Sequence, residues 1–366
     1  MSKRPNGKWR ARFRDAAGKE HARHFARKAD ADQWLAAQTT AVVRGDWVDP
    51  ALSRVTVAEW SKVWLATKAQ LRPKTIEKYE SSLRIWVLPR WGDVPLNKIT
   101  HADLVKWVAE IQEGRSPQHT RHTLLVMSQM LRLAVRDGRL TRNVADGVPK
   151  PRAARPVQRF LSHKEVAALA REMPAPYDIL VVLLAFTGLR FGEAAALHVG
   201  DVDLDRARLT VNWSVTELRG GVLYRDAPKT YRRRTVPIPA FLATRLAELV
   251  AGRPDDASVF SGSKGGPLRN SNFRHYFFDP AVRRAGLEPL TPHNLRDTAA
   301  SLAVASGASV KVVQRMLGHA SAAMTLDVYS GLFDAELDDV ADRMGADASE
   351  AMREWRPGGD DRPSGQ

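Results

Sequence analysis

The segment that most constrains this chain is residues 291–331, where helix-forming sequence near the carboxyl end is divided by glycines. Gly307 and Gly318 are placed as glycines that end helices, which predicts three short helices. We expect the first helix to end near residue 305, the second to span residues 309–317 and the third to span residues 321–329. Thr291 is placed as an N-cap and Pro292 as the first helical residue, so the first helix presents an amide-rich, positive end. That end favours an anion.

Four side chains of this segment suit phosphate chemistry. His293 and Arg296 are three residues apart, which puts them on one face of the first helix, within reach of the same phosphate. His319 falls in the turn after the second helix, and Tyr329 lies on the third. Singly, each has an ordinary structural explanation, since a His-x-x-Arg pair is usually a surface pair and a single Tyr usually packs. The combination therefore predicts a site only if further cations converge on it.

Two upstream segments supply such cations. Residues 177–200 read as an apolar helix, a Thr-Gly turn and a second helix that begins at Arg190, with Glu193 one turn on. Residues 207–237 alternate as strands do, with a Gly-Gly hairpin turn, and Lys229 precedes the last strand. We expect Arg190 to be rigidly placed and Lys229 to overhang a groove.

At this point the chain resembles the tyrosine recombinase, or phage integrase, family. The motifs TGLRFGE, PKT followed by RRTVPIP, HNLR, LGHAS and TLDVY occur in the family's order and approximate spacing within residues 162–345. The resemblance implies a supporting acid, Glu193, and a catalytic set of six residues: Arg190, Lys229, His293, Arg296, His319 and Tyr329.

These residue types also fit phosphodiester cleavage on chemical grounds. Arg190 and Arg296 can neutralise charge on the non-bridging oxygens, so neither a metal nor another cofactor is expected. Tyr329 is the candidate nucleophile, because a phenol with a pKa of about 10 gives a reversible phosphotyrosine and retains the bond energy without ATP. Lys229 is the better candidate for protonating the leaving 5'-hydroxyl. The separate roles of the two histidines stay open.

The composition indicates a polyanionic partner. The 366 residues contain 56 Lys and Arg against 41 Asp and Glu, a net charge of +15, which points to nucleic acid. The absence of Cys excludes disulfides and thiolate zinc sites, and the histidines lack metal-ligand spacing. The longest apolar run, residues 179–186, is too short to span a membrane, and no signal-type core follows the basic N-terminus. We expect a nucleoid-associated protein of the bacterial cytoplasm.

The N-terminal residues 1–28 hold ten Lys or Arg and two acids, and residues 9–14 alternate apolar with basic. Arg10, Arg12 and Arg14 would thus form one cationic face of a strand. A turn, a second strand and a helix over 29–43 follow. The stretch resembles the arm-binding domain of phage integrases, a three-stranded sheet plus helix that reads distant DNA sites. The alternatives are a solvated tail or an Arg-rich transit peptide.

Residues 53–148 are helical in pattern, with basic and hydroxyl residues at helix starts that favour DNA phosphates, although some are ordinary caps. The candidate contacts are Arg72, Lys74, Thr120 and Arg121. This part resembles the SAM-like, all-α core-binding domain of integrases. The predicted organisation is an α+β arm domain with linker at 1–52, the helical domain at 53–148, a linker at 149–160, a mainly α catalytic domain with a small antiparallel sheet at 161–345, and a disordered tail at 346–366.

Residues 332–344 read as an acidic amphipathic helix. Two interpretations remain open for it. It packs on its own domain, or it docks on a neighbouring protomer.

The resemblance implies a homotetrameric site-specific recombinase that acts through a 3'-phosphotyrosine and a Holliday junction. It would bind core-type and arm-type DNA sites to integrate or excise a phage or other mobile element, with a DNA-bending host factor and an excisionase as further partners. The alternatives are chromosome-dimer resolution, relaxation like that of a type IB topoisomerase, and a non-catalytic DNA-binding regulator. The intact set of six residues argues against the last.

The charge predicts that DNA binding weakens steeply with added salt. Counterion release lowers the logarithm of the binding constant by about 0.9 per neutralised phosphate for each tenfold rise in salt. Fluorescence anisotropy on duplex DNA across a salt series measures this slope. A flat response would show that the basic excess does not contact phosphates.

Overall fold

The computed structural model describes residues 1–15, 18–45, 47–152, 158–228 and 233–334, with residues 341, 342, 344, 345 and 348 beyond them. The chain divides into two compact units, Met1–Arg155 and Pro156–Gln366. Several predictions lie outside the described residues: those for Lys229, for most of the acidic helix at 332–344, for nearly all of the tail at 346–366 and for the middle of the linker.

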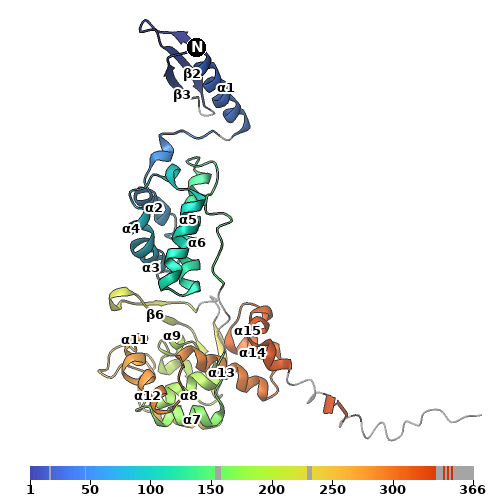
Figure 1. Cartoon of the computed structure of the whole chain (residues 1–366). Helices are drawn as coiled ribbons and strands as arrows, with labels where there is room; N and C mark the ends of the chain where they lie inside the picture. Colours follow the sequence, from blue (N-terminus) through green and yellow to red (C-terminus); the bar gives the residue numbers. More distant parts are fainter. Residues whose placement is uncertain are drawn as a thin grey trace, which may run out of the picture. The chain divides into compact units, whose positions relative to one another are not determined.

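The first unit begins with an antiparallel sheet of three strands that covers a helix (Figure 1). The elements are β1 (Ser2–Lys3), β2 (Trp9–Arg14), β3 (Glu20–Phe25) and α1 (Lys28–Arg44). Ala11 is buried, and the Phe13 ring meets the Trp34 ring of α1 edge-on at 5.5 Å. Because side chains alternate along a strand, Arg10, Arg12 and Arg14 share the other face. The predicted sheet-plus-helix fold is confirmed.

The rest of the first unit is helical. Its helices are α2 (Val57–Ala66), α3 (Pro73–Ser82), α4 (Leu88–Trp91), α5 (His101–Gly114) and α6 (Pro117–Arg136). A π-helical turn at Leu83–Val87 joins α3 to α4. Thr56 forms a capping box with Glu59 at the start of α2, and the Trp60 indole donates a hydrogen bond to the Met130 carbonyl, 2.9 Å away, which ties α2 to α6. The predicted all-α part is confirmed.

The core of the second unit forms around α8 (Tyr177–Thr187), which is apolar on almost every side and therefore buried. It packs against α7 (His163–Arg171), α10 (Ala240–Val250) and α13 (Pro292–Ala305). The remaining helices of this unit are α9 (Phe191–Ala194), α11 (Asn270–Phe273), α12 (Asp279–Arg284), α14 (Val310–Leu317) and α15 (Ala322–Asp334).

Two small antiparallel sheets complete the second unit. One has the order β4 (Val202–Asp203), β5 (Arg208–Val211), β8 (Arg234–Pro237), and the other pairs β6 (Ser214–Glu217) with β7 (Leu223–Asp226). Gly220 and Gly221, both with a φ of 77°, lie in the predicted hairpin turn between β6 and β7. This mainly α fold with small sheets is the one that the resemblance implied.

The carboxyl-terminal helices α13, α14 and α15 are separated where the glycines predict. Gly318 has a left-handed φ of 66° and ends α14, and Gly307, with a φ of 82°, follows α13. The three helices share a small core that includes Val304, Leu317 and Tyr329. Within the described ranges, no helix is long and apolar enough to cross a membrane.

Candidate active site

Arg296 lies at the centre of the site and joins two helix ends. Its side chain is 2% exposed, and its guanidinium donates hydrogen bonds to the carbonyls of Gly188 and Leu317, the latter at 2.6 Å. These carbonyls end α8 and α14, where intrahelical partners are lacking. Burial, followed by the charge of Arg190, lowers the pKa of Arg296 to about 9, so it remains a cation at neutral pH.

A buried carboxylate bridges two further arginines. Arg190, the N-cap residue of α9, donates from Nη1 to Glu193 Oε1 at 2.8 Å, and Arg234 binds both oxygens, at 3.1 and 2.6 Å. Burial alone would raise the pKa of Glu193. The hydrogen bonds and charges of Arg234, with the charge of Arg190, outweigh it and hold that pKa at about 2. The carboxylate is therefore ionised and fixes both guanidinium groups.

Arg234 was not among the residues that the sequence singled out. It lies on β8, and its Nε also donates to the Met316 carbonyl at 3.2 Å. A Cβ at Gly318 would come within 2.9 Å of its Cδ, so glycine is needed there for space as well as for φ. The sequence signal was a run of three arginines whose last member, Arg234, begins the RTVPIP strand, but the run alone does not show which arginine points into the site.

The two predicted histidines differ in environment. The His319 Nδ1 atom is hydrogen-bonded to the Thr325 hydroxyl at 3.0 Å. Burial, together with the charges of Arg296 and Arg190, lowers the pKa of His319 to about 4. It is thus neutral at pH 7. His293 is exposed on the first turn of α13, close enough for its charge to contribute to that shift. The site therefore combines fixed cations with a neutral imidazole.

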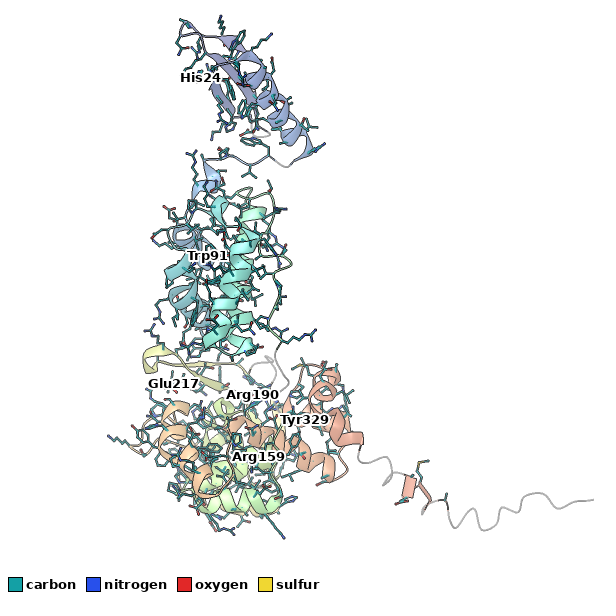
Figure 2. The ribbon with its side chains drawn as sticks, viewed as in Figure 1. His24, Trp91, Arg159, Arg190, Glu217 and Tyr329 are labelled. Atoms are coloured by element: carbon teal, nitrogen blue, oxygen red, sulfur yellow. The ribbon has the colours of Figure 1, made fainter. Side chains whose placement is uncertain are left out.

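Tyr329 reaches the same region from α15, far along the chain from Arg190; both are labelled in Figure 2. Its hydroxyl donates a hydrogen bond to Asp297 Oδ1 at 2.7 Å, and its ring lies parallel to the His319 ring with centroids 6.4 Å apart. Burial, then the Asp297 charge, raises the pKa of Tyr329 above its usual value, while Arg296 and Arg190 oppose this. The phenol is protonated.

Asp297 is the second residue that sequence reasoning missed. It directly follows HNLR, where an acid inside a cationic motif was the available signal. The structure thus gathers five of the six predicted residues around the Glu193 bridge, with Arg234 and Asp297 added. Lys229 falls outside the described ranges.

The predicted DNA contacts are placed differently from one another. The three strand arginines share the outer face of β2, where Arg10 and Arg12 approach the Glu20 carboxylate. At the helix starts, the N-cap residue of α3 is Arg72, Lys74 pairs with Glu77, and Arg121 is exposed.

Thr120, another predicted DNA contact, is 0% exposed, and its hydroxyl donates to the Ser116 carbonyl at 3.4 Å. Its side chain is therefore withheld from a surface-bound ligand, because it completes the first turn of α6.

For metal binding, the described residues contain no group of three or more His, Asp or Glu side chains placed to hold an ion. The positive charge of the described site comes from the guanidinium groups of Arg190, Arg234 and Arg296.

Comparison with known proteins gives three family matches in order along the chain. The N-terminal domain of phage integrases matches residues 1–44, the N-terminal SAM-like domain of phage integrases matches 56–112, and the phage integrase family matches 159–336.

Similar curated sequences include the integrase of Mycobacterium phage D29, 27% identical over 88% of this chain and 88% of its own length. The tyrosine recombinase XerD of Corynebacterium glutamicum is 28% identical over 72% of this chain and 91% of its own.

Among solved structures, the Tn1549 transposon integrase in complex with transposon right end DNA gives a TM-score of 0.69 at 20% identity, over 78% of this chain and all of the other. A lambda integrase dimer bound to a core site gives 0.58 at 20% identity, over 98% and 96%. These likenesses concern the fold.

The Glu193 bridge predicts a stability change. Replacing Glu193 with Gln leaves two arginines without their shared anion, and breaking a buried ion pair from one side costs about 3 kcal/mol. Urea denaturation of the full-length protein at neutral pH measures the loss. The Glu172→Gln control breaks an exposed pair with Arg284 and should cost less than about 1 kcal/mol.

The same bridge gives a pH dependence with a defined sign. Folding lowers the pKa of Glu193 from 4.5 to about 2. The contribution of Glu193 to the free energy of unfolding is therefore complete above pH 4.5 and is lost as the pH falls toward 2. The stability difference between wild type and Glu193→Gln should therefore shrink over this range. A difference that stays constant would contradict the charge-based account.

Proposed function

Since the chain belongs to the phage integrase family of tyrosine recombinases, we propose that Tyr329 is the nucleophile with which this site-specific integrase cuts and rejoins DNA. The observation that supports this most is the convergence of Tyr329 from α15 with Arg190, Arg296 and His319, from distant parts of the sequence, in one small region. Such convergence fits a single scissile phosphate.

In this proposal, Arg190 and Arg296 bind that phosphate. Arg190 and Arg296 place positive charge beside its non-bridging oxygens, where charge grows as the phosphorus is attacked. Glu193 holds Arg190 in position before DNA arrives, since its carboxylate is already ionised and bonded. The preformed cations stabilise the transition state without reorganising.

Cleavage then requires one nucleophilic attack and two proton transfers. The Tyr329 hydroxyl gives its proton to one of the two histidines, His293 or His319, its oxygen bonds to phosphorus, and the bond from phosphorus to the 5'-oxygen breaks. The leaving 5'-oxygen takes a proton, for which Lys229 is the proposed donor. His319, neutral at pH 7, can accept or donate a hydrogen bond at the phosphate. The reverse sequence, with a 5'-hydroxyl from another strand, rejoins the DNA.

DNA binding is proposed to divide between two surfaces of the first unit. The basic face of β2 would bind arm-type sites, and the starts of α3 and α6, with Arg72, Lys74 and Arg121, would bind core-type sites. The match of residues 1–44 to the N-terminal domain of phage integrases supports the first assignment. It also favours integration or excision of a mobile element over chromosome-dimer resolution, since the match to XerD covers 72% of the chain.

The assembly is proposed by analogy. A solved lambda integrase is a tetramer bound to a Holliday junction, with a TM-score of 0.56 to this chain. We propose a homotetramer on DNA, with a bending host factor and an excisionase setting direction, in the bacterial cytoplasm.

Replacing Tyr329 with Phe tests the nucleophile. The variant should bind a nicked core-site duplex as wild type does but form no covalent complex, because only the hydroxyl oxygen is removed. Denaturing gels of the trapped reaction measure the adduct. The Tyr276→Phe control alters a tyrosine that is 65% exposed and should react normally. An adduct with Tyr329→Phe would assign the attack to another residue.

The β2 face generates a separate expectation. Deleting residues 1–45 should abolish arm-site binding and leave core-site binding, measured by gel shifts on the two DNA types. A variant with Arg10, Arg12 and Arg14 all changed to Ala keeps the sheet and should show the same selective loss. Equal loss on both DNA types would refute the division of labour.

A further inference from the structure

The nucleophilic oxygen is closed off from solvent. Tyr329 is 2% exposed, and the rings of His319 and Phe160 are its neighbours, each with its centroid 6.4 Å from that of Tyr329. Apolar residues of α13 and α14 complete the enclosure. A phosphodiester cannot touch a hydroxyl in this position, so the tyrosine must move before it can react.

The Tyr329 hydroxyl is bonded to a buried residue of α13, the helix that carries His293. Asp297 follows His293 by four residues on α13, which places it on nearly the same face and about 6 Å farther along the helix. His293 is exposed, whereas Asp297 is 8% exposed. The Tyr329 hydroxyl is therefore held at a buried position about one helical turn along α13 from the exposed His293.

The bond to Asp297 also opposes the chemistry. The phenol has one proton and donates it to a carboxylate at 2.7 Å, a strong class of hydrogen bond. Removing that proton would place a phenolate beside the carboxylate, and like charges at this distance repel. While the bond persists, Tyr329 is both misplaced and protonated.

The described side chains of α15 attach it to its neighbours at two buried positions. Of its side chains that the structure describes, Thr325 and Tyr329 are the buried ones, while Met324 and Val328 on its outer side are 45% and 39% exposed. Each buried residue makes one hydrogen bond to a neighbouring element: Thr325 to His319, and Tyr329 to Asp297. Releasing the hydroxyl requires breaking the Tyr329 bond to Asp297 and moving the ring out of the small core that it shares with α13 and α14.

We propose that Asp297 is a positioning residue that latches Tyr329 in a resting state, and that covalent attack begins with the breaking of this hydrogen bond. The inference rests on the proposed role of Tyr329 as nucleophile and adds a control on when it acts. Arg296 is the neighbour of Asp297 on α13, and its charge already acts on the Tyr329 hydroxyl in the latched position. The competing role, in which Asp297 accepts the tyrosine proton during attack, predicts the opposite kinetics.

Single-turnover cleavage separates the two roles. On a nicked core-site duplex, Asp297→Asn should form the covalent adduct about tenfold faster than wild type, since a hydrogen bond to a charged group is worth about 1.4 kcal/mol or more. Asp205→Asn, at an exposed position, removes the same charge and should react at the wild-type rate. Slower adduct formation by Asp297→Asn would overturn the latch and favour proton acceptance.

A second readout needs no DNA. The chain has 6 Tyr, so NMR of protein labelled at the tyrosine ring carbon that bears the hydroxyl can follow each one, with Tyr329 assigned from the signal lost in Tyr329→Phe. Asp297 and burial oppose ionisation of Tyr329, while Arg296 and Arg190 favour it, and the neutral His319 lies against its ring. Tyr329 should titrate above the exposed tyrosines in wild type and at lower pH in Asp297→Asn.

The outcomes distinguish the latch from the proposed function. A Tyr329 that titrates with the exposed tyrosines, or one unaffected by Asp297→Asn, overturns the latch while leaving the nucleophile assignment intact. An adduct formed by Tyr329→Phe overturns the nucleophile assignment whatever the NMR shows.

Discussion

The ion pairs of Glu193 are the interaction on which the rest of the site depends. Arg190, Arg234 and Arg296 are cations of one small region, and like charges repel strongly where water is scarce. The buried Glu193 carboxylate offsets this repulsion, and its pKa of about 2 keeps it charged at neutral pH. Glu193 thus lets the fold hold the arginines close together in the place where we propose that the phosphate binds.

The cations and the nucleophile are built differently. Arg296 is bonded to two helix ends in the core of the second unit, and Arg190 is fixed by the start of α9. Tyr329 instead sits on α15, where Thr325 and Tyr329 are the buried residues among the described side chains. In the mechanism that we propose, a rigid binding site with a movable nucleophile would let DNA bind before the backbone can be cut, which would limit cleavage away from the intended site.

Much of this arrangement could be predicted from sequence, and the failures have a common cause. The helix break at Gly318 follows from a local signal, the conformation that glycine allows, whereas the convergence on Arg296 was implied by the resemblance to the tyrosine recombinases. Arg234 and Asp297 could not be identified that way, since their roles come from partners far along the chain: Glu193 for the arginine, Tyr329 for the aspartate. The local sequence of a charged motif does not show which distant residue each of its charged side chains will contact.

The central claim is that one phenol and a cluster of cations act on a single phosphate, and mass spectrometry tests it most directly. Wild-type protein is trapped on a nicked core site, digested with trypsin and nuclease, and the nucleotide-bearing peptide is sequenced. Residues 316–343 form one tryptic peptide with a single tyrosine. The account predicts a 3'-phosphonucleotide on Tyr329 in this peptide. A nucleotide on any other residue would contradict it.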